Sequence, residues 1–188
     1  MRIHALMEQS TVNGPGKRAV LWTQGCSLSC RGCWNPDTHP VEGGRGEMDT
    51  LDLLNWLTPL APNIEGLTIS GGEPMQQPAA LLSLLIAVRR RFPGLSIGMY
   101  SGYAERELER NYLTLWHEIR RRLDFAIMGR YNAALPCGDP FTTSTNQRLV
   151  LFSNRYQLAD FKEQSVEVTI APDGLTQVTG FPVRGSIA

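Results

Sequence analysis

The chain has 188 residues, of which 42% are hydrophobic, so it is long enough for one domain with a real core and too short for two of ordinary size. Its 18 lysines and arginines balance 18 aspartates and glutamates, which argues against bulk binding to nucleic acid or to an anionic membrane. No window approaches the ~20 apolar residues that span a bilayer, and the first residues lack the apolar core of a signal peptide. We therefore expect a single cytoplasmic domain.

The first half of the chain predicts two strands with a helix between them. After a turn-rich start, residues 17–25 are apolar and extended in character, and they lead directly into a loop that contains three cysteines. Asp49 and Asp52 favour the start of a helix, which the prolines that follow would end. A β-branched run at 65–70 then predicts a strand that stops at the sequence Gly-Gly-Glu-Pro.

The second half continues this alternation. Pro78 suits a first helical position, and the helix it begins is expected to end at three consecutive arginines, with strands following at 95–102 and 123–129. Between those strands a helix is predicted from the spacing of Leu108, Tyr112, Leu115 and Ile119. A further strand at 147–154, a short helix and a C-terminal hairpin that turns at Pro172-Asp173-Gly174 complete the chain.

Strands that alternate with helices imply parallel βαβ units, so the carboxyl ends of the strands should lie at one edge of a sheet. Unusual residues follow four of the predicted strands: the cysteine loop, the Gly-Gly-Glu-Pro sequence, Tyr100-Ser101-Gly102-Tyr103 and Met128-Gly129-Arg130-Tyr131-Asn132. We expect these four loops to line one pocket.

The cysteine loop has the sequence GCSLSCRGCW, in which Cys26, Cys30 and Cys33 lie within eight positions. A structural zinc site usually needs four ligands in two separated pairs; His39 or the distant Cys137 could add a fourth, but neither has the spacing of a zinc finger. Iron-sulfur clusters are held by closely spaced thiolates, and a cube with three protein thiolates keeps one iron open for chemistry. The compact trio therefore favours a 4Fe-4S cluster over a zinc knuckle.

The order Cys-x3-Cys-x2-Cys after a first strand, followed by Gly-Gly-Glu-Pro, resembles the radical S-adenosylmethionine (SAM) enzymes. The resemblance implies that Cys26, Cys30 and Cys33 hold the cluster and that SAM chelates its open iron. One electron from the cluster then cleaves SAM to methionine and a 5'-deoxyadenosyl radical, which abstracts a hydrogen atom. The resemblance also implies a low-potential electron donor, such as flavodoxin or ferredoxin.

A closer resemblance links the chain to the small activating enzymes of anaerobic ribonucleotide reductase. The shared features are a VNGPG sequence at 12–16, Gly32 before the third cysteine, and the later sequences SGGEP, SGY, GRY and STNQ. On this basis we expect a compact partial (βα) barrel of mostly parallel strands, with its core at about 10–150 and a C-terminal β-hairpin extension at 151–188. The resemblance implies that SAM contacts come from Trp34, Asn35, Ser70, Gly71, Gly72, Glu73, Ser101, Gly102, Tyr103, Arg130, Asn146 and Gln147.

Two features depart from these activating enzymes. Met128 occupies a position where they have aspartate, and the chain continues past residue 150 beyond their compact length. Residues 177–181 superficially resemble the segment around the radical glycine of the partner enzymes, but a hairpin strand is the better interpretation. No role is assigned to Cys137 or to the three histidines.

An incomplete barrel leaves a broad lateral opening, which favours a loop of a large protein over a small molecule as the substrate. The leading hypothesis is an activating enzyme that abstracts hydrogen from a glycine of a glycyl radical enzyme. A radical SAM maturase or tailoring enzyme, acting on a peptide, nucleotide or small metabolite, is the main alternative. An iron-sulfur or zinc protein for electron transfer or assembly is the alternative without catalysis.

Overall fold

A computed structural model describes residues 1–137, 141–161, 166–170, 174 and 176–180. Its main feature is a seven-stranded sheet in the order β3-β1-β2-β4-β5-β6-β7. The parallel centre consists of β2 (Arg18–Thr23), β4 (Gly66–Gly71), β5 (Ser96–Ser101) and β6 (Phe125–Met128). These are the first four strands that the sequence predicts, and the mostly parallel α/β architecture is confirmed.

Antiparallel strands lie at both edges of this parallel centre. On one side β1 (Arg2–Ser10) pairs with β2 and with the two-residue strand β3 (Gly46–Glu47), and on the other β7 (Arg148–Leu151) pairs with β6. The sequence predicted turns at the start of the chain, but Arg2–Ser10 form the strand β1, so that prediction was wrong. Its sequence places buried Ile3 and Met7 among polar and half-exposed residues, so it lacks the continuous apolar run that marks the central strands.

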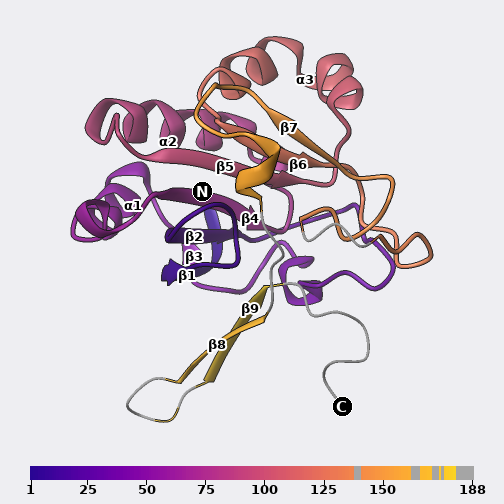
Figure 1. The fold of residues 1–188 in the computed structure, drawn as a ribbon, viewed down its shortest axis with the longest axis horizontal. Coiled ribbons are helices and arrows are strands. Elements are labelled where there is room, and N and C mark those ends of the chain that lie inside the picture. Colours follow the sequence, from indigo (N-terminus) through magenta and orange to yellow (C-terminus); the bar gives the residue numbers. More distant parts are fainter. Residues whose placement is uncertain (138–140, 162–165, 171–173, 175, 181–188) are drawn as a thin grey trace.

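Three helices, α1 (Thr50–Leu57), α2 (Pro78–Arg91) and α3 (Glu105–Arg120), cover one face of the sheet (Figure 1). Helix α1 begins where expected because Asp49 and Asp52 form a reciprocal capping box. The main core lies between this helical layer and alternate residues of the strands, such as Leu21, Ile69 and Ile97. In the described part of the chain, no helix is both long enough and apolar enough to cross a membrane.

Helix α3 differs from the prediction in its phase. Tyr112 has non-helical backbone angles (φ −138°, ψ 25°) and interrupts the helix in its middle. Because of this kink, the fully buried residue of the following turn is Trp116, whereas Leu115 is only half-buried. An uninterrupted helical spacing had placed Leu115 on the buried face.

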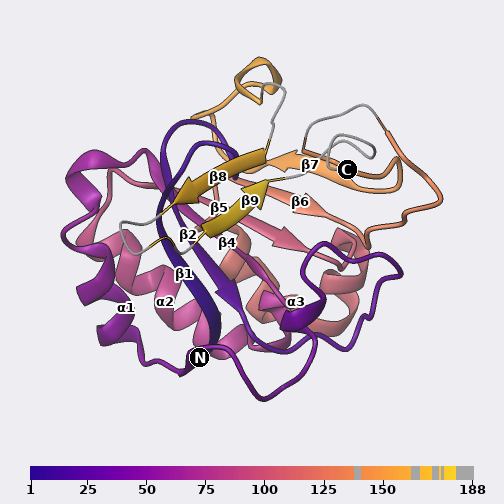
Figure 2. The ribbon, with the colours of Figure 1, turned by 90° about the horizontal axis from the view of Figure 1, so that it is seen from below.

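The C-terminal region follows β7 with a one-turn 3-10 helix (Leu158–Asp160) and a two-stranded sheet of β8 (Val166–Ile170) and β9 (Thr176–Gly180). The predicted short helix and hairpin are therefore present, and residues 177–180 form a hairpin strand as expected. Pro172 and Asp173 of the predicted turn lie outside the described residues. The hairpin lies on the face of the large sheet opposite the helices (Figures 1 and 2).

Candidate functional site

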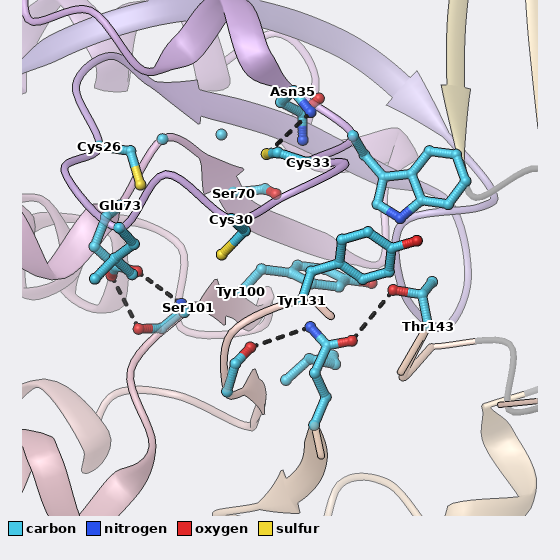
Figure 3. Close-up of a pocket in the computed structure, with 18 of the residues that line it drawn as sticks. Cys26, Cys30, Cys33, Asn35, Ser70, Glu73, Tyr100, Ser101, Tyr131 and Thr143 are labelled. Carbon is cyan, nitrogen blue, oxygen red and sulfur yellow. Dashed lines mark hydrogen bonds between the residues drawn. The ribbon is translucent and has the colours of Figure 1, made fainter. Parts of the chain in front are cut away.

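A pocket lies at the carboxyl ends of the four parallel strands, where their loops converge (Figure 3). Its volume, including the open mouth, is about 720 Å³. All but three of the residues singled out from the sequence line it: Cys26, Cys30, Cys33, Trp34, Asn35, Ser70, Gly71, Gly72, Glu73, Ser101, Gly102 and Gln147. The strand order thus brings together loops that are far apart in the chain.

The cysteine loop is held at its start by two backbone hydrogen bonds. Gly25 N donates to Thr38 O (2.8 Å) and Cys26 N donates to His39 O (3.0 Å). Gly25 has a φ of +99°, a conformation that favours glycine, so the chain can leave β2 and turn sharply into the loop. At Ser29, φ is +46°, which is uncommon for a residue with a side chain and turns the loop back between the first and second cysteines.

The three thiols are free and partly buried in the pocket wall. Burial raises the pKa of each thiol, and for Cys30 the neighbouring Cys33 raises it further. The backbone N–H of Asn35 donates to the Cys33 sulfur at 3.4 Å, as Figure 3 shows. Within the described ranges, no three His, Cys, Asp or Glu side chains lie close enough together to hold one metal ion. A soft, compact donor set of this kind suits iron-sulfur ligation.

Glu73 connects the ends of β4 and β5 from inside the protein. Its fully buried carboxylate accepts hydrogen bonds from Met75 N (2.9 Å), Ser101 Oγ (2.9 Å) and Gly102 N (2.7 Å). Burial nevertheless raises the pKa of Glu73 to about 7, against an ordinary value of 4.5. The carboxylate therefore fixes the relative position of two pocket loops and titrates near neutral pH.

This raised pKa makes stability depend on pH. A group whose pKa is higher in the folded state stabilises most below its unfolded pKa of 4.5 and loses that contribution as pH rises through about 7. The change is on the order of 3 kcal/mol. In urea unfolding of the metal-free protein, we expect the wild type to lose stability as the pH rises from 4.5 to about 7, and we expect Glu73→Gln to lose much less over the same range. Glu8→Gln, on the exposed face of β1, is the control, and equal pH dependence in all three proteins would contradict the assignment.

Gly71 and Gly72 bring the end of β4 against the base of the cysteine loop. Gly71 has a φ of +103°, Gly72 N donates to Thr23 O (2.8 Å), and Glu73 N donates to Gly25 O (3.0 Å). A Cβ atom on Gly72 would lie 2.5 Å from the carbonyl oxygen of Gly25, a backbone atom that cannot move aside alone. The two glycines are therefore required for this close approach.

Gly72→Ala is expected to displace the cysteine loop and to lower the free energy of unfolding by about 2 kcal/mol or more. Gly94→Ala is the matched control, because a Cβ there meets nothing within 4 Å and its φ is not positive. Chemical denaturation and the iron content after reconstitution measure the two effects. Equal behaviour of the two variants would show that the loop tolerates the extra carbon.

Three of the predicted contact residues, Tyr103, Arg130 and Asn146, do not line this pocket. Arg130 Nη1 binds both carboxylate oxygens of Glu107 (2.9 and 3.0 Å), and its guanidinium carbon lies 5.7 Å from the Tyr103 ring centre. Asn146 Nδ2 donates to the carbonyl of Arg130 (2.6 Å). These side chains form a cluster beside the pocket, so their predicted contacts with SAM stay predictions.

The pocket also contains residues to which the sequence assigned no contact with SAM. Tyr131 lies 5.7 Å from Trp34 between ring centres, and Tyr100, Phe141 and Thr143 complete the wall. His39 lines the pocket as well, although its spacing from the cysteines gave no sign of a role. It arrives there through the one-turn 3-10 helix at Pro36–Thr38, and its buried Nε2 has no hydrogen-bond partner among the described residues.

A mostly parallel α/β sheet with three cysteines in the loop after one strand is consistent with an iron-sulfur protein of the radical SAM type. The family described as a 4Fe-4S single cluster domain matches residues 12–150. The anaerobic ribonucleoside-triphosphate reductase-activating protein of Enterobacteria phage T4 is 33% identical over 145 residues, which are 73% of this chain and 86% of the phage protein. The chain belongs to this 4Fe-4S family of radical SAM activating enzymes. The family match favours a 4Fe-4S cluster over the zinc interpretation.

Other relatives match a shorter part of the chain. The pyruvate formate-lyase-activating enzyme of Staphylococcus epidermidis is 40% identical over 79 residues, and that of Clostridium pasteurianum is 41% identical over 88 residues. These alignments cover 40% and 45% of this chain, and 32% and 37% of the relatives. The chain thus spans about a third of the length of these two activating enzymes.

Proposed function

We propose that the protein is a radical SAM enzyme, a single domain over residues 1–188, that activates a glycyl radical enzyme by abstracting hydrogen from a glycine. The substrate that the comparisons favour is an anaerobic ribonucleotide reductase, because the phage T4 relative is named as its activating protein and matches over most of its own length. The single observation that supports the chemistry best is the presence of three free, half-buried cysteines in one strand-end pocket.

In this proposal Cys26, Cys30 and Cys33 supply the thiolates for the cluster, and their sulfurs draw together when it binds. The bound cluster and SAM together supply a 5'-deoxyadenosyl radical that removes the hydrogen atom. The raised pKa values of the thiols mean that each must lose a proton on binding, so reconstitution releases protons.

The remaining pocket residues bind SAM and exclude water. The backbone at Gly71 and Gly72 can approach the ligand closely, with carbonyl groups that accept from its amino group. Trp34 and Tyr131 provide an aromatic wall, and Ser70, Ser101 and Gln147 provide polar groups at the strand ends. Arg130 would have to leave Glu107 to bind the carboxylate of SAM. A low-potential flavodoxin or ferredoxin would provide the electron.

The decisive experiment is an anaerobic incubation of the cluster-reconstituted protein with SAM, dithionite and the anaerobic ribonucleotide reductase of the source organism. Electron paramagnetic resonance should detect a glycyl doublet, and mass spectrometry should detect 5'-deoxyadenosine. Deoxyadenosine without the doublet would favour a maturase or tailoring enzyme. If the cluster is intact but neither the glycyl doublet nor deoxyadenosine appears, radical chemistry is contradicted. The result would then favour the alternative of an iron-sulfur protein for electron transfer.

A further inference from the structure

A second cavity lies between the C-terminal hairpin and the edge of the large sheet. Its volume, including the open mouth, is about 1020 Å³. His4 and Ala5 of β1 and Trp22 of β2 form one side, and Val178, Thr179 and Gly180 of β9 form the other. The hairpin lies on the face of the large sheet opposite the helices (Figure 2), so its contribution to the lining places the cavity on that side of the sheet.

The second cavity shares part of its wall with the cluster pocket. Trp34, Asn35 and Ser70 line both, so a ligand that reaches them from the hairpin side is already at the wall of the site of radical formation. A molecule that donates a hydrogen atom must reach that wall from a direction that SAM does not occupy. The hairpin side of Trp34 provides such a direction.

The chemistry of the second cavity is that of a neutral polypeptide site. Among the described residues that line it, none has a carboxylate, ammonium or guanidinium group, and His4 is the one with a titratable side chain. It offers the amides of Asn13 and Asn35, the hydroxyls of Ser70 and Thr179, and indole rings. A phosphate or carboxylate ligand would find only the His4 imidazole, whose Nδ1 already contacts Gln24 Oε1 (2.7 Å), as a group that can be cationic. Backbone N–H and C=O groups could pair with the amides and hydroxyls, while small side chains contact the rings. The lining therefore favours an uncharged segment of protein over a nucleotide or an acidic metabolite.

The hairpin has a fixed position at this cavity. Glu167 of β8 accepts hydrogen bonds from Thr11 N (3.1 Å) and Thr11 Oγ1 (3.3 Å), and Asn13 Nδ2 donates to Thr179 Oγ1 (2.9 Å) at a buried contact. The hairpin also lies outside the segment that matches the family. It is thus a wall that this chain adds to a site whose chemistry belongs to the shared core.

We propose that the cavity between β9 and the β1–β2 edge binds an uncharged, glycine-containing segment of the protein substrate, and that the β8–β9 hairpin is its recognition wall. This inference rests on the proposed function, because it takes the glycyl radical enzyme as the partner. Val178 and Ile170 allow a matched test: both are β-branched hairpin residues, 57% and 69% exposed, but only Val178 lines the cavity.

The measurement is the dissociation constant of the cluster-loaded protein with the anaerobic ribonucleotide reductase of the source organism, by anaerobic biolayer interferometry. Val178→Asp places a charge in the neutral cavity and is expected to raise the dissociation constant about tenfold. Ile170→Asp is expected to change it less than twofold. Ala5→Trp narrows the same cavity from β1 without altering the hairpin, and it should also weaken binding about tenfold. All three variants should still form 5'-deoxyadenosine from SAM at the wild-type rate.

Wild-type affinity in both Val178→Asp and Ala5→Trp would overturn the inference and leave the proposed function intact. Equal weakening by Val178→Asp and Ile170→Asp, with none by Ala5→Trp, would also overturn it and place the contact on the outer apolar face of the hairpin. If the wild type forms no deoxyadenosine and does not bind the reductase, the proposed function is wrong, and the inference that rests on it is overturned with it. Wild-type deoxyadenosine formation without reductase binding would overturn the choice of a protein segment as the occupant.

Discussion

Replacing Cys26, Cys30 or Cys33 with alanine, one at a time, is expected to abolish cluster binding and to reduce 5'-deoxyadenosine formation at least about 100-fold. The three thiols lie in one pocket on a loop that backbone bonds hold at its start, and two thiolates cannot retain a cubic cluster with a single open iron. Iron content per chain, the visible absorbance of the cluster and single-turnover product analysis measure the loss.

Cys137→Ala is the matched control for these variants. Cys137 lies outside the pocket, where its sulfur contacts the carbonyl oxygen of Thr142. Its removal should leave iron content and deoxyadenosine formation within about twofold of the wild type. A Cys30→Ala protein with a full cluster and full activity would disprove the assignment of the three ligands.

Arg18→Met is expected to lower the free energy of unfolding by about 3 kcal/mol or more. Arg18 is 0% exposed, at the start of β2, and it donates to Thr68 Oγ1 (2.7 Å), Ser96 Oγ (2.7 Å) and the Leu67 carbonyl (2.9 Å). Its guanidinium also lies over the Phe125 ring at 5.1 Å. A thioether fills much of the volume but supplies none of these donors, and of the two hydroxyl oxygens only Ser96 Oγ keeps another donor, the Tyr156 hydroxyl (2.7 Å).

Among the described residues, no carboxylate forms a salt bridge with Arg18, and the nearest acidic partner in its network is Glu65. The phenol of Tyr156 lies between the Arg18 guanidinium and the Glu65 carboxylate. Its oxygen is 3.3 Å from Arg18 Nη1 and 2.9 Å from Glu65 Oε1. Burial lowers the pKa of Arg18, and the neighbouring Tyr156 opposes this effect. Tyr156→Phe should therefore cost stability as well, by about 1–2 kcal/mol.

Lys17→Met is the control for Arg18→Met, because Lys17 is the adjacent residue and is exposed. Urea unfolding at neutral pH measures all three variants. Because Arg18 lies at the opposite end of β2 from the cysteine loop, Arg18→Met protein that remains folded should still bind a cluster. A loss of less than about 1 kcal/mol would mean that the hydroxyl groups around Arg18 satisfy one another without it.

The parallel centre of the fold was predictable because its signals are local. Continuous apolar runs marked β2, β4, β5 and β6, and capping or proline positions marked the starts of α1 and α2. The main pocket residues followed from this, since the ends of parallel strands share one edge of the sheet. The positions of the strand ends were sufficient to predict that the cysteine loop, Glu73 and Ser101 lie close together.

What the sequence left unpredicted depends on contacts between distant segments. Strand β1 is defined by its pairing with β2 and not by its own half-polar sequence. The loop that brings Phe141 and Thr143 to the pocket has no periodic pattern, and His39 reaches it through a single helical turn. The position of Arg130 was set by Glu107, a partner on α3 whose relevance no sequence motif indicated.

Hydrogen bonds at Thr11 and Asn13 join the hairpin of β8 and β9 to the rest of the protein, and its apolar residues Val168, Ile170 and Val178 are all more than half exposed. A two-stranded ribbon without a core of its own has little intrinsic stability. Its amide hydrogens should therefore exchange with solvent by local opening, at a free energy far below that of the seven-stranded sheet. The hairpin that selects the partner and the core that generates the radical would then unfold as separate cooperative units. Mild proteolysis could remove the hairpin while the core stays folded.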